Sequence, residues 1–405
     1  MVQMIKRSCC AVFFILIISG LYGESPAMQA YLQRFIRADL LGKVDILYEA
    51  STNSDLKSTP LYLYALEFVL GNYAQIDDLR DMNNIISLSK NGLTEEKRSR
   101  NINASDAEKM LDVLWELFLK YQDADVRADI IIALSDLGYG NRNLVGRINN
   151  YLSDLCNLYT IGETIDYSIV SACISALMAL GDSSSYPVLF SIIRSGFPEV
   201  ISSESYGALE EIPGNLHQFI ISIIENNPPD EKYAAYRAVI NSERLSVSEQ
   251  GQLAELALSQ SLLAGGFQAG EDNADLSVMR YSAVRTLSKL RWTRANSLAI
   301  RHYYITQADY NHGLIPKELF LEAIACLGAV GNSDAALVLG LQLGLINIRT
   351  ESTGVFDDEI TMAIVQSLGL IGDKAAFYHL SYVTNLPYTE YIIASAKEAI
   401  NRLKW

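Results

Sequence analysis

The chain has little of the residues that build disulfide frameworks, metal sites and breaks in regular structure. Its 405 residues include only 5 Cys, 4 His and 9 Pro, while 50% of the residues are apolar. This composition excludes disulfide-rich, collagen-like and intrinsically disordered proteins, and it provides material for a sizeable core. The sequence also lacks the period-two alternation of half-buried strands, so we expect helices.

Basic residues are in the minority. The chain holds 32 Lys and Arg against 47 Asp and Glu, which gives a formal charge of −15 at pH 7. A surface this acidic repels nucleic acid and anionic lipid, because charge repulsion must be overcome before any phosphate contact is gained. We therefore expect no nucleic-acid partner.

Signatures of catalysis and of cofactor binding are missing. The four histidines show no HExxH spacing, and the sequence contains no phosphate-binding P-loop, no GxGxxG after a strand and no GxSxG elbow. The acidic run at residues 357–359 falls at an expected helix start, where negative charge is favourable. We therefore expect no metal, no cofactor and no enzymatic activity.

The N-terminus has the pattern of a secretory signal peptide. Lys6 and Arg7 precede an unbroken apolar run at residues 9–18, CCAVFFILII. This run is about half as long as the ~20 residues that a transmembrane helix requires. We expect removal of residues 1–23, which hold two basic residues and no acidic one, leaving a mature chain of net charge −17 in the periplasm or secreted, with no integral membrane segment. The alternative is that the run is retained as an anchor.

Without the leader, three cysteines are left: Cys156, Cys173 and Cys326. Their number is odd, and their separations are far too wide for a CxxC pair, so no disulfide framework is implied. Cys173 and Cys326 lie among small and apolar residues at helical spacing, which indicates small core residues. Export together with few cysteines fits a bacterial periplasmic protein.

One helical pattern recurs from Asp123 onward. Each clear copy begins with Asp or Pro and continues with an aliphatic residue at +3, a small or aliphatic residue at +7, Leu at +11 and an apolar residue at +14. At about 100° per residue these offsets fall within an arc of about 80°, which makes one apolar stripe on one helix. Clear copies begin at Asp123, Asp166, Pro316 and Asp357, and a Gly after the last apolar position ends each helix.

A second amphipathic segment follows the Gly, as at residues 183–193, 333–345 and 374–383, so each unit is a helical hairpin. Three weaker copies of the pattern are also present. We call the residues at +11 of all copies the +11 column, which consists of Leu134, Leu177, Leu209, Leu287, Leu327, Leu368 and Ile400. The steps along this column are 43, 32, 78, 40, 41 and 32 residues. The step of 78 leaves room for a degenerate unit with helices near 233–240 and 253–263.

The motif D-x-x-V-R-x-x-A-x-x-A-L-x-x-L-G-D, best kept at 123–138 and 166–182, resembles HEAT repeats in the bacterial HEAT-like form also found in phycobilin lyases. The Arg of the motif is present at Arg127 and Arg280. The resemblance covers residues 105–405 and implies an all-α, armadillo-like α-solenoid of stacked hairpins, with residues 24–104 as an N-terminal helical cap region. Stacked repeats offer an extended surface, so together with the predicted leader they favour a scaffold for protein–protein interactions in the bacterial cell envelope. The alternative is a HEAT-like lyase or isomerase acting on a protein-bound small molecule.

One interval departs from the acidic average. No Asp or Glu occurs between Asp275 and Asp309, where six basic residues fall: Arg280, Arg285, Lys289, Arg291, Arg294 and Arg301. Arg285 and Lys289 are expected on the helix side opposite the apolar stripe. The functional hypothesis is a basic binding stripe for an acidic protein partner. The alternative is a solvated face that balances an otherwise acidic chain.

Overall fold

The computed structural model describes residues 25–404 apart from 54–55, 77, 100–101, 103 and 264–273. These residues form 20 α-helices and no strand, so the predicted all-α solenoid class is confirmed. The predicted signal peptide, residues 1–23, lies outside the described residues. Among the helices that the structure describes, none is both long enough and apolar enough to span a membrane. The chain divides into two compact units, residues 1–214 and 215–405.

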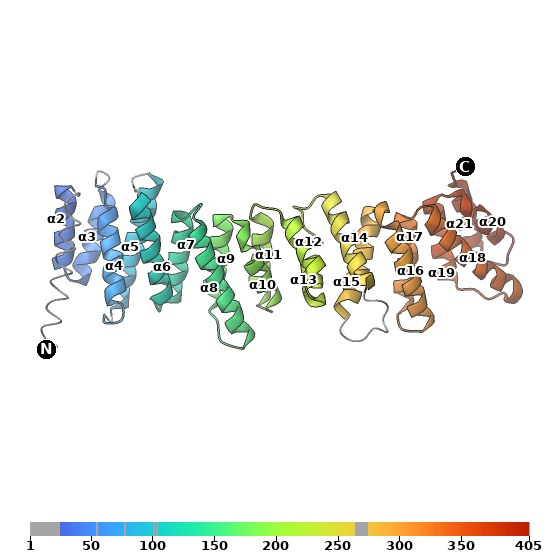
Figure 1. Cartoon of the computed structure of the whole chain (residues 1–405), viewed down its shortest axis with the longest axis horizontal. Coiled ribbons are helices and arrows are strands. Elements are labelled where there is room, and N and C mark those ends of the chain that lie inside the picture. The colour runs from blue at the N-terminus through green and yellow to red at the C-terminus, as the bar shows by residue number, and fades with distance from the viewer. Residues whose placement is uncertain are drawn as a thin grey trace. The chain divides into compact units, whose positions relative to one another are not determined.

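In its described part, unit 1 contains ten α-helices and one short 3₁₀ helix (Figure 1). These are α2 (Pro26–Arg37), α3 (Leu40–Thr52), α4 (Thr59–Asn72), α5 (Leu79–Arg98), α6 (Ala104–Lys120), α7 (Ala124–Leu137), α8 (Arg142–Thr160), α9 (Tyr167–Leu180), η2 (Ser183–Ser185), α10 (Tyr186–Arg194) and α11 (Glu199–Glu211).

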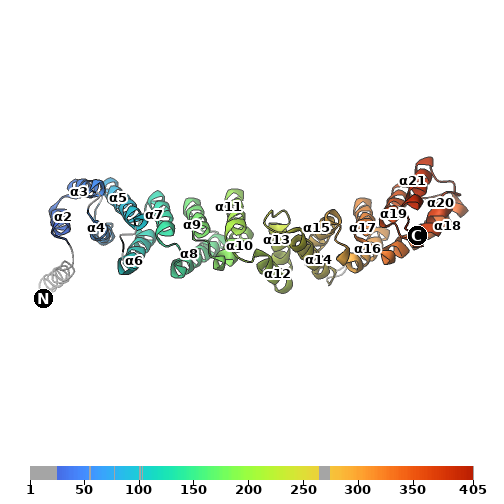
Figure 2. The same cartoon turned by 90° about the horizontal axis from the view of Figure 1, so that it is seen from above.

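The helices of unit 1 lie in two layers, which Figure 2 shows from above. In one layer α3 packs on α5, α5 on α7, α7 on α9 and α9 on α11, while the other layer contains the even-numbered helices, with α4 packed on α6 and α8 on α10. Helices α2 to α5, which belong to the region expected as a cap, follow this same alternation. Each hairpin therefore buries its apolar stripe against its neighbours, as repeat arrays do.

Unit 2 has the same organisation. Its described helices are α12 (Leu216–Asn226), α13 (Pro229–Val239), α14 (Val247–Leu263), α15 (Ala274–Leu290), η5 (Thr293–Ala295), α16 (Asn296–Asn311), α17 (Lys317–Val330), α18 (Ser333–Thr353), α19 (Asp358–Ile371), η6 (Lys374–Ala376), α20 (Phe377–Val383) and α21 (Glu390–Asn401). Odd-numbered helices α13 to α21 pack in succession in one layer, and α12 to α20 in the other (Figure 2).

The helix boundaries follow the predicted start and stop signals. Asp123 caps α7 by accepting hydrogen bonds from the backbone N–H groups of Asp125 and Val126, and Asp357 caps α19 in the same way. Gly181 and Gly372 end α9 and α19 at φ of 66° and 69°, a backbone conformation that favours glycine. Helices α13 and α14 lie where the degenerate unit was expected. Helix α18 continues eight residues beyond the predicted 345.

The +11 column forms the core of both units. Leu134, Leu177, Leu209, Leu287, Leu327 and Leu368 are all at most 2% exposed. Only Ile400, in the last helix, remains partly exposed. The predicted register of the repeat is therefore confirmed at its most regular position.

Within each unit, polar side chains connect some of the successive repeats. The Asn83 side chain donates to the Asp123 carboxylate at 3.1 Å, and the Ser367 hydroxyl donates to the Ile324 carbonyl at 3.1 Å. The partners are 40 and 43 residues apart, close to one repeat step. Such bonds satisfy polar groups within a largely apolar stack.

The three cysteines are free and buried. Burial raises the pKa of the Cys156 and Cys326 thiols to about 11 and raises that of Cys173 as well. A thiol held in its protonated form is a poor nucleophile and a poor metal ligand. The interpretation of Cys173 and Cys326 as small core side chains is therefore confirmed.

Candidate functional site

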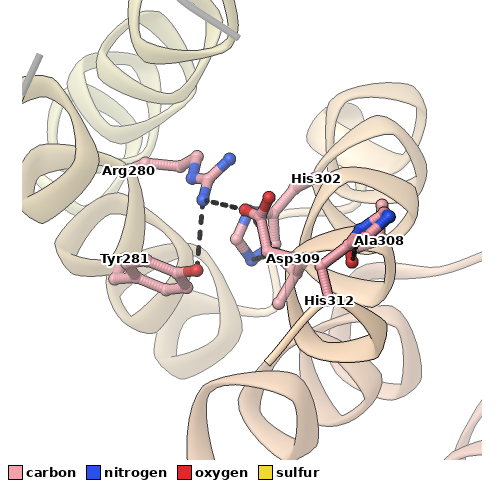
Figure 3. Close-up of polar contacts among 7 residues, drawn as sticks. Arg280, Tyr281, His302, Ala308, Asp309 and His312 are labelled. Carbon is pink, nitrogen blue, oxygen red and sulfur yellow. Dashed lines mark hydrogen bonds and ion pairs between the residues drawn. The ribbon is translucent and has the colours of Figure 1, made fainter. Parts of the chain in front are cut away.

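The structure separates the six basic residues of the predicted stripe into three groups. Arg280 is buried, with 1% of its surface exposed, and its side chain points from α15 toward α16 (Figure 3). This position corrects the prediction for Arg280, because a guanidinium in the core cannot meet a partner at the surface. The signal was present in the sequence, since Arg280 occupies the Arg position of the repeat motif.

Arg127, the other motif arginine, has a comparable structural role in unit 1. Its Nε donates to the Phe118 carbonyl at 2.7 Å, and its Nη2 donates to the Tyr151 hydroxyl at 2.6 Å. The guanidinium also lies over the Phe118 ring, 5.1 Å from the centroid. The motif arginine therefore connects α7 to the helices on either side of it in the chain.

Arg280 is less well satisfied than Arg127. Its Nη2 lies 3.1 Å from the Tyr281 hydroxyl and 3.5 Å from Asp309 Oδ2 on α16 (Figure 3). Its Nε and Nη1 atoms are buried and have no hydrogen-bond partner. Because an unpaired buried donor costs free energy, these two atoms offset part of the stabilisation that the ion pair with Asp309 provides.

His302 lies against this pair and is completely buried. Its ring meets the Tyr281 ring edge-on, with 5.4 Å between centroids. Burial, reinforced by the nearby Arg280 guanidinium, lowers the pKa of His302 to about 3. The imidazole is therefore neutral at physiological pH, and a second cation would have to form beside Arg280 if it were protonated.

Acidification is expected to destabilise unit 2 through His302. The pKa of this histidine is about 3 in the folded protein against 6.5 for an ordinary histidine, so only the unfolded chain takes up the proton between these values. The stability gained from a neutral His302 is fully present above pH 6.5 and decreases as the pH falls. At pH 5 the free energy of unfolding is lower by about 2 kcal/mol on this account. Urea unfolding at pH 7.5 and pH 5 should show a smaller difference for His302→Asn than for the native protein. His312→Asn, at an exposed site, is the control, and an equal pH dependence in all three proteins would contradict this role of His302.

Two further members of the stripe have partners within the protein. Arg285 on α15 makes a two-pronged ion pair with Glu322 on α17, with both N–O distances 3.0 Å. Arg301 on α16 donates to the Leu262 carbonyl at the end of α14, at 3.0 Å. These contacts join successive repeats, as does the Lys317–Glu359 pair between α17 and α19. The predicted solvent exposure of Arg285 is confirmed, but its charge is compensated.

The remaining three cations surround the turn that leads from α15 through η5 to α16. Lys289 and Arg291 are exposed and form no ion pair among the described residues. Arg294 is 64% exposed and lies 3.5 Å from Glu255 on α14. We call Lys289, Arg291 and Arg294 the basic turn. It is a smaller and more local positive surface than the six-residue stripe.

Trp292 holds the basic turn against α14. Its indole N–H donates to Glu255 at 2.7 Å, and its ring lies so close to Gly251 that a Cβ there would come within 2.6 Å of it. The Arg294 guanidinium lies over the same indole ring, 5.6 Å from its centroid. The turn is therefore positioned by a helix of the preceding repeat.

Arg291 adopts an unusual backbone conformation, and it is the only non-glycine with positive φ, at 50°, in the described part of the chain. It ends α15 in a Schellman arrangement, in which the Trp292 N–H bonds to the Leu287 carbonyl and the Arg291 N–H to the Ser288 carbonyl. The corresponding residue in α9 and α19 is glycine. A side chain in this conformation costs about 1 kcal/mol or more, so the structure accepts strain to place an arginine here.

The described residues contain no group of three or more His, Cys, Asp or Glu side chains placed to hold a metal ion. Comparison with known proteins finds no family model and no curated protein that the sequence matches. The candidate site is therefore supported by its geometry alone. It is a basic, exposed turn that is fixed by Trp292 and strained at Arg291.

Proposed function

We propose that the protein is an exported, non-catalytic scaffold of HEAT-like repeats that binds an acidic protein partner in the bacterial cell envelope. The observation that carries the proposal is Arg291, a strained arginine at a turn where the best-kept repeats have glycine. Residues with strained backbones cluster at functional sites. The helical hairpins of unit 2 provide the rigid support that such a contact requires.

Charge supports an acidic partner over other classes. The chain as a whole is strongly acidic, so charge attracts an acidic partner only at a local cationic surface. Lys289, Arg291 and Arg294 provide such a surface, and two of them have no competing carboxylate. Arginine pairs well with carboxylates because its planar group donates two parallel hydrogen bonds.

Export is the second part of the proposal, and it depends on the leader pattern at residues 1–23. N-terminal sequencing of protein from an envelope fraction should find a chain that begins near Glu24. An intact N-terminus in washed membranes would show a retained anchor instead. Co-purification of a chromophore or another small molecule would favour the lyase or isomerase alternative.

Reversing the charge of the basic turn tests the binding site. The variant Lys289→Glu/Arg291→Glu/Arg294→Glu should lose partner capture in envelope crosslinking and pull-down experiments, with an unchanged helical spectrum. Capture by the native protein should also weaken as salt rises, because exposed charges are screened over about 8 Å at physiological ionic strength. The control variant Lys374→Glu/Lys397→Glu/Lys404→Glu makes the same change in net charge at other exposed sites and should retain capture. Equal capture by all three proteins would contradict the proposal.

Arg291→Gly separates function from folding. Glycine relieves the strain of positive φ, so this variant should be as stable as the native protein or more stable, by up to about 1 kcal/mol. The same variant should capture less partner, because it lacks the guanidinium. A loss of capture in a stabilised protein cannot be explained by unfolding.

A further inference from the structure

The solvent-facing side of α18 is apolar along most of its length. Leu337, Leu341, Leu345 and Ile348 are 53, 64, 65 and 63% exposed. With Leu337 as zero, they lie at about 0, 40, 80 and 20° around the helix, in a stripe about 16 Å long. No other helix in the described part of the chain exposes more than two large apolar side chains. We call these four residues the α18 stripe.

Neighbouring helices of unit 2 leave the α18 stripe uncovered. Helix α18 contacts α16, α17, α19 and α20, and these contacts bury its other side, including Leu339 and Leu343. Between Asp334 and Arg349 the helix contains no charged residue, although 20% of the chain is charged. An exposed apolar surface of this extent, bordered by polar residues, is typical of an interaction site.

Two exposed charges of opposite sign stand at the ends of the α18 stripe. Asp334 lies in the first turn of α18 and Arg349 near its end, and neither forms an ion pair among the described residues. On the same angular scale they lie at about 60 and 120°, so both are on the same side of the centre line of the stripe, which runs at about 35°. Glu351 is on the other side, at about −40°, where its carboxylate accepts a hydrogen bond from the Tyr382 hydroxyl at 2.9 Å.

We propose that the α18 stripe binds the same stripe of a second copy of this chain, in an antiparallel, two-fold symmetric pair. A two-fold interface requires a self-complementary surface. The stripe is uncharged, so no like charges come into direct contact where two copies of this acidic chain meet. In an antiparallel pair, equivalent sides of the two helices adjoin, which brings Asp334 of one copy to the side that holds Arg349 of the other.

The lengths along the helix agree with this pairing. If the pair is centred at residue 343, between Leu341 and Leu345, then Asp334 lies opposite position 352 of the other copy. Arg349 is three residues from that position, a distance of about 4.5 Å along the axis that an arginine side chain can bridge. By symmetry the pair contains this contact twice. One helix face is a small interface, so we expect a reversible dimer with micromolar affinity.

Sedimentation equilibrium of the mature protein tests the proposal. The native mass should approach twice that of one chain as concentration rises through the micromolar range. Leu341→Ser/Leu345→Ser should remain monomeric, and because both side chains are exposed the helical spectrum should not change. Leu370→Ser, at a 56% exposed leucine on α19, is the matched control and should still dimerise.

The orientation of the pair has its own test. Asp334→Lys and Arg349→Glu each place like charges together at two symmetric contacts, so each should weaken dimerisation about tenfold. The double variant Asp334→Lys/Arg349→Glu exchanges the charges and should recover most of the native affinity. Additive losses in the double variant would overturn the antiparallel pairing.

A native protein that stays monomeric throughout this range, or a Leu341→Ser/Leu345→Ser variant that still dimerises, would overturn the proposal. A heterologous protein that is captured only when the stripe is intact, with the native chain monomeric, would assign the surface to a different partner and would also overturn it. The outcome is independent of the proposed scaffold function, because the charge-reversed basic turn should leave dimerisation unchanged.

Discussion

Leu368→Ala is expected to destabilise unit 2 by about 2 to 5 kcal/mol. Leu368 is completely buried in α19 at the +11 position of its repeat. Its side chain fills space between consecutive repeats, since α19 packs against α17 and α21. Truncation to alanine removes apolar contacts and leaves a cavity that rigid neighbouring helices cannot close completely. Urea unfolding monitored by circular dichroism measures the loss.

Leu370 in the same helix provides a matched control. It differs from Leu368 by two positions and is 56% exposed. Leu370→Ala should change the unfolding free energy by less than about 0.5 kcal/mol. Similar effects at the two sites would show that the +11 column is not the core column.

Leu177→Ala makes the equivalent change in α9 of unit 1. Because each repeat contacts only its neighbours, the damage should remain local. Hydrogen exchange should therefore accelerate in α7, α9 and α11, which pack against one another, and not in unit 2. Uniform acceleration across both units would indicate a single cooperative block instead.

The regular features of the fold could be predicted from sequence because they depend on local chemistry. Asp123 and Asp357 mark helix starts, since a carboxylate caps free N–H groups two and three residues later in the chain. Gly181 and Gly372 mark helix ends for an equally local reason. The leucine column follows from helical periodicity alone. These signals located the hairpins, including the degenerate one at α13 and α14.

The state of each basic side chain could not be predicted in the same way. The interval that contains Arg285 is free of acidic residues, yet its partner, Glu322, comes from the next repeat, 37 residues away. A count of charges along the chain does not include contacts between stacked helices. The apolar side of α18 was missed for a related reason. The segment 333–345 was expected to be amphipathic, but residues 335–341 are apolar at every position, and such a run does not reveal which side the neighbouring helices cover.

Asp309→Ala is expected to cost about 3 to 5 kcal/mol, because it leaves a permanently charged guanidinium in the core without its carboxylate. Asp309 and Arg280 have side chains only 8% and 1% exposed. Arg280→Met should cost less. That variant also removes the buried Nε and Nη1 donors of Arg280, which have no hydrogen-bond partner in the native protein.

The double variant Arg280→Met/Asp309→Leu should recover most of the lost stability and lie within about 1 kcal/mol of the native protein. It removes both charges together with the unpaired Nε and Nη1 donors of Arg280, and it replaces them with apolar side chains of similar size. The difference between the double variant and the sum of the single variants measures the coupling of the pair. If the two single losses simply add, Arg280 and Asp309 do not act as a unit. Recovery would instead show that this buried pair contributes little net stability and that its main effect is to penalise the loss of either partner.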